Sequence, residues 1–110
     1  MNIMTKNIQH RITIRATPAQ VFEALMDGKK HAAFTGEPAS ITGREGGRFT
    51  CYGDYIRGFN LELEAGKRIV QAWRSRDWPN GIYSIVTFNL SPNGRNGTVL
   101  RFSQIGVPVP

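Results

Sequence analysis

Cysteine and histidine are scarce in this sequence, which narrows the chemistry available to it. A single cysteine, Cys51, excludes an internal disulfide. Together with His10 and His31 it provides too few soft ligands for a zinc site unless distant carboxylates join them. The sequence also has no Gly-x-Ser-x-Gly elbow, no His-Glu-x-x-His motif and no phosphate-binding glycine loop. We therefore expect no metal, no cofactor and no catalytic residues.

Long hydrophobic runs are absent too. No apolar stretch approaches the roughly 18 residues that a membrane-spanning helix needs. The first ten residues, MNIMTKNIQH, lack the apolar core of a secretory signal. We expect a cytoplasmic protein that makes no contact with a membrane.

Acidic residues are few beside basic ones. Eight Asp and Glu against 14 Lys and Arg give a net charge of +6, which favours acidic partners. The basic residues are scattered, with adjacent pairs only at Lys29-Lys30 and Lys67-Arg68. Such scatter is more typical of a solvated surface than of a nucleic-acid site.

The length of 110 residues predicts one domain over residues 1–110. With 40% hydrophobic and 20% charged residues the chain is typical of a folded globular protein, and its 12 glycines favour a β protein rich in turns. The alternation of Ile8–Arg15 predicts a strand whose apolar face includes His10. Thr17 then opens a helix in a capping box with Gln20, and Lys29–Phe34 could form a second short helix.

Glycine-rich turns after Pro38 predict an antiparallel meander. The six expected strands are Ala39–Ile41, Arg48–Cys51, Tyr55–Glu64, Arg68–Trp73, Tyr83–Ser91 and Thr98–Ile105. In the last two strands, Phe88 and Phe102 share a face with aliphatic residues, whereas Asn89 and Arg101 lie on the other face. The pattern predicts one apolar and one wet face. The prolines in Gly106–Pro110 exclude a further helix or central strand, so a covering element for the apolar face is expected to be missing.

These motifs resemble the family related to the activator of the heat-shock protein 90 ATPase, within the START-like superfamily. The matching stretches are Ala16–Leu25, Phe34–Gly36, Gly46–Phe49, Gly58–Leu63, Arg68–Arg74, Asp77–Pro79 with Gly81, Tyr83–Phe88 and Gly106–Pro108. The resemblance implies an α+β helix-grip fold, a curved antiparallel sheet with two short amino-terminal helices. Family domains usually continue past Gly-Val-Pro into a long covering helix. We expect a truncated chain, or a concave face covered by a ligand or by a second copy in a homodimer.

The resemblance implies a cavity on the concave side of the sheet. The candidates for its lining are His10, Tyr55, Phe59, Trp73, Tyr83, Phe88 and Phe102. Each has an ordinary alternative, because aromatic residues also fill cores and a histidine at a core edge is usually satisfied by a neighbour. The candidates for docking a partner are Arg11, Arg15, Arg101 and Trp78. For these the alternative is a solvated sheet surface and a tryptophan folded back over the sheet edge.

We expect a non-enzymatic binding domain that takes a small apolar ligand or a protein partner on its concave sheet. The first alternative is a co-chaperone-like module that stimulates a chaperone ATPase through its basic surface, which the resemblance implies. The second is a hydrolase or cyclase that uses the cavity, as in the wider superfamily.

Overall fold

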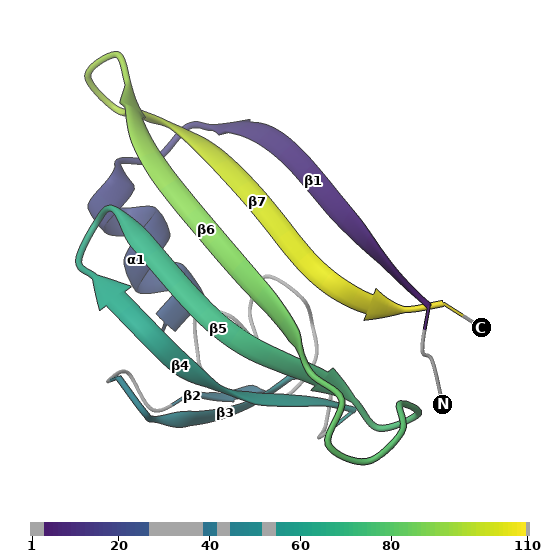
Figure 1. The fold of residues 1–110 in the computed structure, drawn as a ribbon. Coiled ribbons are helices and arrows are strands. Elements are labelled where there is room, and N and C mark those ends of the chain that lie inside the picture. Colours follow the sequence, from purple (N-terminus) through teal and green to yellow (C-terminus); the bar gives the residue numbers. More distant parts are fainter. Residues whose placement is uncertain (1–3, 27–38, 42–44, 52–54, 110) are drawn as a thin grey trace.

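The described part of the chain forms a single antiparallel sheet of seven strands with one helix beside it (Figure 1). The computed structural model describes residues 4–26, 39–41, 45–51 and 55–109. Its elements are β1 (Thr5–Ile14), α1 (Pro18–Met26), β2 (Ala39–Ile41), β3 (Arg48–Cys51), β4 (Ile56–Glu64), β5 (Arg68–Ser75), β6 (Ser84–Asn93) and β7 (Gly97–Pro108). The strand order is β1-β7-β6-β5-β4-β3-β2, so the last strand pairs with the first. The predicted meander is confirmed, whereas the second helix predicted at Lys29–Phe34 lies outside the described residues.

Helix α1 begins where the sequence predicted. The Thr17 backbone N–H donates to Gln20 Oε1 at 2.9 Å, and the Gln20 N–H donates to Thr17 Oγ1 at 3.2 Å, which completes the capping box. The hydroxyl of Thr98 donates to the Ala16 carbonyl at 2.7 Å and joins the start of the helix to β7. These bonds fix the direction in which α1 leaves the sheet.

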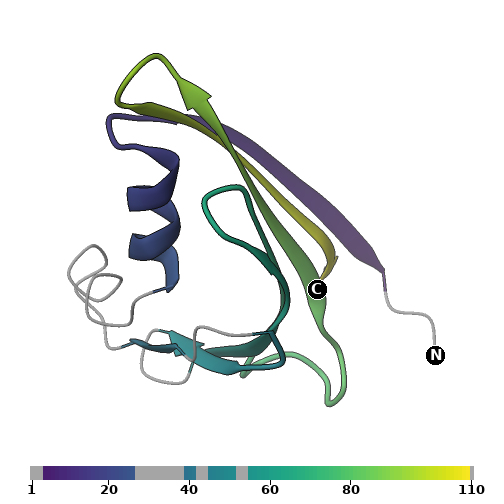
Figure 2. The ribbon, with the colours of Figure 1, turned by 90° about the vertical axis from the view of Figure 1, so that its left-hand side faces the viewer.

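The sheet curves, and α1 lies on its concave side (Figure 2). Val21 of α1 packs there against Leu90 and Leu100, and all three side chains are buried. The residues that pack around this cluster are Ile14, Ala16, Phe22, Leu25 and Phe88. The burial of these side chains at one end of the concave face supplies much of the stability of the fold.

Strand β7 runs further than expected. The expected bounds Thr98–Ile105 were too short at this end, because β7 continues to Pro108 and pairs with β1 up to Thr5. The pairing of β7 with β6 ends at Ile105, so Pro108 has a strand neighbour on one side only. A proline fits such a position because its missing N–H costs no ladder hydrogen bond there.

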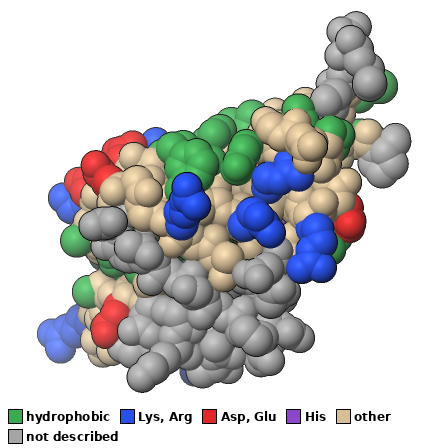
Figure 3. All heavy atoms as spheres, turned by 90° about the horizontal axis from the view of Figure 1, so that it is seen from below, with side chains coloured by type: hydrophobic (Ala, Val, Ile, Leu, Met, Phe, Trp, Pro, Cys, Tyr) green, Lys and Arg blue, Asp and Glu red, His purple; other side chains and the backbone are tan. Residues whose placement is uncertain are grey.

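The convex face is not uniformly polar. This corrects the expectation that one face of the sheet is apolar and the other is polar and solvent-exposed. Ile85 pairs with Ile105 across β6 and β7, and both side chains point away from the α1 side, with exposed fractions of 39% and 53%. Seen from below, the molecule shows hydrophobic side chains beside several Lys and Arg side chains (Figure 3). Because Arg11 and Arg101 share this side of the sheet with Ile85 and Ile105, the convex side combines apolar and basic residues.

Candidate binding site

Five rings form a connected aromatic cluster on the concave face, contributed by β1, β3, β5, β6 and β7. The aromatic cluster consists of His10, Phe49, Trp73, Phe88 and Phe102. Phe88 and Phe102 lie 5.3 Å apart between ring centroids, and Trp73 lies 6.4 Å from each of them. His10 stacks on Phe102 at 6.1 Å, and Phe49 meets Trp73 edge-on at 6.0 Å. Separations and angles of this kind are favourable for aromatic pairs.

The strand register explains why these rings meet. His10 lies opposite Phe102, and Phe102 lies opposite Phe88, so three adjacent strands place a ring in one cross-strand row. Because side chains alternate along a strand, Phe88 shares its face with Leu90, which packs against α1. The aromatic cluster thus continues the apolar face on which the helix sits.

Helix α1 covers only part of this face. Leu90 and Leu100, at the helix end, are 6% and 7% exposed, whereas Ile12, which lies opposite Leu100, is 49% exposed. Phe102 is half-buried and His10 is exposed. The aromatic cluster therefore lies beside the helix-covered core and keeps part of its surface open.

Amide side chains form a buried polar network beside the aromatic rings. Trp73 Nε1 donates to Gln71 Oε1 at 2.8 Å, and Gln71 Nε2 donates to Asn60 Oδ1 at 2.9 Å. Asn60 is 0% exposed and Gln71 is 6% exposed. Gln104 Nε2 donates to the hydroxyl of Ser84, also fully buried, at 2.9 Å. These bonds satisfy groups that would otherwise be costly to bury, and they fix the orientation of the Trp73 ring.

The polar network was not predicted from the sequence. The available signal was Gln71, which stands between Ile69 and Trp73 at the alternate positions of one strand, where an apolar residue would be expected. The alternation places Gln71 on the apolar face, but only the register with β4 brings Asn60 opposite to it.

Four of the predicted cavity residues lie together, namely His10, Trp73, Phe88 and Phe102. The other three lie elsewhere. Phe59 and Tyr83 contact each other with ring centroids 5.7 Å apart, and Phe59 is paired with Ala72 on the convex side. The hydroxyl of Tyr55 donates to the carboxylate of Asp77. A concave cavity would thus be lined by four of the seven candidates.

A β4 bulge explains the placement of Phe59. Phe59 and Leu63 are four residues apart, so strict alternation would put both on one face. The register shifts between Asn60 and Glu62, after which Leu63 pairs with Ile69 on the concave side. A bulge inserts one extra residue, so each side chain beyond it lies on the face opposite to the one that strict alternation predicts.

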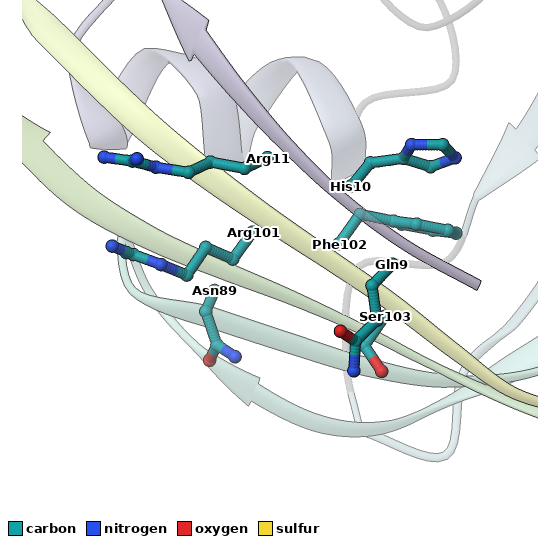
Figure 4. A pocket seen from close by; sticks show the side chains of 7 residues that line it. All are labelled: Gln9, His10, Arg11, Asn89, Arg101, Phe102 and Ser103. Atoms are coloured by element: carbon teal, nitrogen blue, oxygen red, sulfur yellow. The ribbon is translucent and has the colours of Figure 1, made fainter. Parts of the chain in front are cut away.

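Two of the predicted docking residues, Arg11 and Arg101, are direct cross-strand partners on the convex side. They line a hollow of about 400 Å³ together with Asn89, Gln9 and Ser103, and their side chains extend side by side (Figure 4). Within the described part of the chain no carboxylate lies within ion-pair distance of either guanidinium. Like charges in opposite positions on a sheet repel each other, so this pair is suited to an external anion.

The other two docking candidates lie apart from this pair. Arg15 is exposed and follows the end of β1. Trp78 is half-buried in the connection between β5 and β6, where its carbonyl accepts a hydrogen bond from Arg74 at 2.9 Å. This connection follows Ser75, the last residue of β5. Arg68, the first residue of β5, lies opposite Asn89, and Asn89 lies opposite Arg101. Trp78 and the Arg11–Arg101 pair therefore lie toward opposite ends of the sheet.

The described residues contain neither a metal-binding cluster nor a membrane-spanning helix. No group of three or more His, Cys, Asp and Glu residues in that part of the chain could hold a metal ion. Among the same residues there is no helix with the length and apolar character needed to cross a membrane.

Comparison with known proteins identifies the family to which the chain belongs. The family model described as Activator of Hsp90 ATPase homolog 1-like protein matches residues 15–110. An activator of 90 kDa heat shock protein ATPase homolog from Dictyostelium discoideum is 32% identical over 105 residues, which are 96% of this chain and 27% of the relative. The chain thus spans about a quarter of the length of that relative.

Solved structures share the fold. A protein from Plasmodium falciparum described as an HSP90 activator superposes with a TM-score of 0.90 at 25% identity, over 94% of this chain and 75% of that one. The Aha1 dimer from Colwellia psychrerythraea gives a TM-score of 0.77 at 20% identity, over 92% of this chain and 76% of that one. With the match over residues 15–110, these findings show that the chain belongs to the family of Activator of Hsp90 ATPase homolog 1-like proteins and has its START-like fold.

Proposed function

We propose that this chain is a non-enzymatic binding domain of a chaperone-associated protein, and that it takes an apolar group on the uncovered part of its concave face. The observation that carries the proposal is the aromatic cluster, which continues the core beyond α1 and keeps part of its surface open. The apolar group is a small ligand or a side chain of a protein partner.

The concave face has the composition of a binding surface. Apolar area that remains open gains roughly 25 cal/mol per Å² when a ligand covers it. Ligand sites combine such area with a few fixed polar groups that orient the ligand. Here Gln104, held by its hydrogen bond to Ser84, and His10, stacked on Phe102, provide polar groups beside the rings.

The test uses the dye 8-anilinonaphthalene-1-sulfonate as an apolar probe. We expect the folded protein to bind the dye, and Phe102→Ala to weaken binding about tenfold, because loss of one aromatic contact removes about 1.4 kcal/mol. Tyr55→Ala is the matched control, since Tyr55 is an exposed aromatic residue that lies outside the aromatic cluster and bonds to Asp77. Equal weakening by both substitutions, or no binding to the folded protein, would contradict the proposal.

A second copy of the chain is another cover for the concave face. The neighbour from Colwellia psychrerythraea is described as a dimer, which supports this possibility for the present chain. Separate sedimentation measurements on the protein and on its Phe102→Ser variant distinguish a dimer formed through the concave face from one formed elsewhere. A dimer formed through the concave face would dissociate in the variant, whereas a dimer formed elsewhere would persist.

The Arg11–Arg101 pair favours a second candidate function, stimulation of a chaperone ATPase by docking on an acidic surface. Two guanidinium groups without a carboxylate partner among the described residues suit an acidic partner, and matched relatives are described as Hsp90 activators. The measurement is the ATPase rate of a purified Hsp90-class chaperone. We expect stimulation that falls with salt and is abolished by the double change Arg11→Glu and Arg101→Glu.

The control for this second candidate is Arg95→Glu. Arg95 is exposed in the turn between β6 and β7, so its reversal changes the net charge without touching the Arg11–Arg101 pair. Stimulation that survives the double reversal, or that Arg95→Glu also abolishes, would count against docking through this pair.

A further inference from the structure

The convex side carries an apolar patch whose residues lie on neighbouring strands. The convex patch consists of Phe59, Tyr83, Ile85 and Ile105. Ile85 lies opposite Ile105 on one side and opposite Ala72 on the other, and Ala72 lies opposite Phe59. Tyr83 is 40% exposed, Ile85 39% and Ile105 53%. Exposed apolar groups gathered on one sheet face and rimmed by polar residues are typical of protein interaction sites.

Arg74 helps to hold the aromatic half of the convex patch in place. Phe59 and Tyr83 meet at an interplanar angle of 60° with centroids 5.7 Å apart, and the Arg74 guanidinium lies 6.0 Å from the Tyr83 centroid. Arg74 also donates to the carbonyls of Trp78, Pro79 and Ile82 at 2.9, 2.7 and 3.2 Å. The rings therefore need little ordering when a partner binds, which reduces the entropic cost of association.

Basic side chains border the aromatic half. Arg48 lies opposite Phe59, and Arg57 lies opposite Arg74. With Phe59 and Tyr83 they line a hollow of about 470 Å³. In the described part of the chain neither Arg48 nor Arg57 has a carboxylate within ion-pair distance, and Figure 3 shows basic side chains gathered beside hydrophobic ones. The apolar area and the unbalanced charge thus lie next to each other.

We propose that the convex patch, with Arg48 and Arg57, docks a protein segment in which apolar side chains are flanked by carboxylates. The apolar side chains of the segment cover Phe59, Tyr83, Ile85 and Ile105, and its carboxylates pair with the two guanidinium groups. The site is separate from the concave aromatic cluster, so the proposal does not depend on the function proposed above.

The chemistry of the convex patch favours this occupant over two others. A second copy stacked on the same face would bring the basic residues of both chains to one interface, where they repel. A single-stranded nucleic acid stacks its bases on flat ring faces. Phe59 and Tyr83 are edge-to-face, Arg74 lies over Tyr83, and the other two members of the patch are aliphatic. An acidic apolar peptide satisfies both the charge and the shape.

The experiment measures the fluorescence anisotropy of a labelled short peptide in which Leu and Glu alternate. A Lys-for-Glu version, a Ser-for-Leu version and an oligothymidine are compared with it. We expect only the Leu-Glu peptide to bind, and binding to weaken at least tenfold in Arg57→Glu and in Ile105→Ser. The matched controls are Arg95→Glu, in a distant turn, and Ile12→Ser, on the concave face with a similar exposure of 49%.

Retained affinity in both controls together with loss in both convex variants would support the proposal. Equal loss in Arg95→Glu would show only general charge attraction and would overturn it, as would tighter binding of oligothymidine or no binding of the Leu-Glu peptide. Concentration-dependent self-association that Ile105→Ser abolishes would assign the patch to a second copy instead. Thermal unfolding of each variant confirms that any loss comes from the surface and not from the fold.

Discussion

The two faces of this one sheet carry aromatic residues in different surroundings. On the concave face Trp73, Phe88 and Phe102 pack against one another, and α1 covers the adjoining aliphatic core. On the convex face Phe59 and Tyr83 form a single ring pair that is bordered by arginines. The comparison teaches that an aromatic residue on a strand contributes to the core or to a surface according to what lies across the neighbouring strands.

The first prediction concerns Gly58, where β4 approaches β5 under the Phe49 ring. A Cβ at this position would lie 1.8 Å from the Ala72 carbonyl oxygen and 2.9 Å from a Phe49 ring carbon. We therefore expect Gly58→Val to cost about 3 kcal/mol or more in urea unfolding. Gly81→Ala is the control. Gly81 has a φ of 80° and nothing within 4 Å of an added Cβ, so we expect about 1 kcal/mol. Equal costs would contradict the crowded packing at Gly58.

The second prediction compares a large aliphatic residue on each face. Leu100 is 7% exposed and packs with Val21 and Leu90, so we expect Leu100→Ala to cost about 3 kcal/mol in unfolding free energy. Ile105 on the convex face is 53% exposed, and we expect Ile105→Ala to cost less than about 1 kcal/mol. A cost at Ile105 as large as that at Leu100 would mean that the convex patch is part of the core.

The third prediction tests the buried polar network. In Gln71→Leu, the Trp73 indole N–H loses its acceptor, Gln71 Oε1, and Asn60 Oδ1 loses the hydrogen bond from Gln71 Nε2. We expect a cost of about 2 kcal/mol and a shifted tryptophan emission spectrum, because the loss of hydrogen bonds between buried polar groups is expensive. Gln9→Leu on the convex face should stay within about 0.5 kcal/mol. An unchanged free energy of unfolding in Gln71→Leu would show that the polar network does not stabilise the fold.

The fourth and smallest effect is expected at the start of α1, which covers only the concave face. Thr17→Ala removes the hydroxyl that accepts the Gln20 N–H, and we expect a cost of about 1 kcal/mol. Thr17→Ser keeps a hydroxyl at this position and should recover most of the loss. If Thr17→Ser were as destabilising as Thr17→Ala, the hydroxyl would not be what stabilises the helix start.

Local patterns were enough to predict most of the fold. The capping box at Thr17 and Gln20, the alternation of Phe88 and Leu90, and the Asn-Gly turns each depend on neighbouring residues only, and they gave the helix and the strands approximately. The continuation of β7 to Pro108 was missed, because the tolerance for proline depends on which strands lie beside it.

The candidate site was also predictable only in part, because local alternation places some side chains and strand pairing places the others. Tyr83 and Phe88 are five residues apart, so alternation alone could have placed Tyr83 on the convex side. Phe59 could not be placed in this way, since the bulge after Asn60 is a property of the pairing of β4 with β5. The meeting of Arg11 with Arg101 likewise depends on the register of two strands that are distant in sequence.

The sequence by itself determined the elements, the apolar character of one strand face and the excess of positive charge, because periodicity and composition are local or additive. Only the tertiary structure decided which rings form the aromatic cluster, that Gln71 meets Asn60, and that Ile85 and Ile105 join Phe59 on the convex side. These contacts depend on register, and register is set when whole strands pair and a bulge shifts one of them by a single residue.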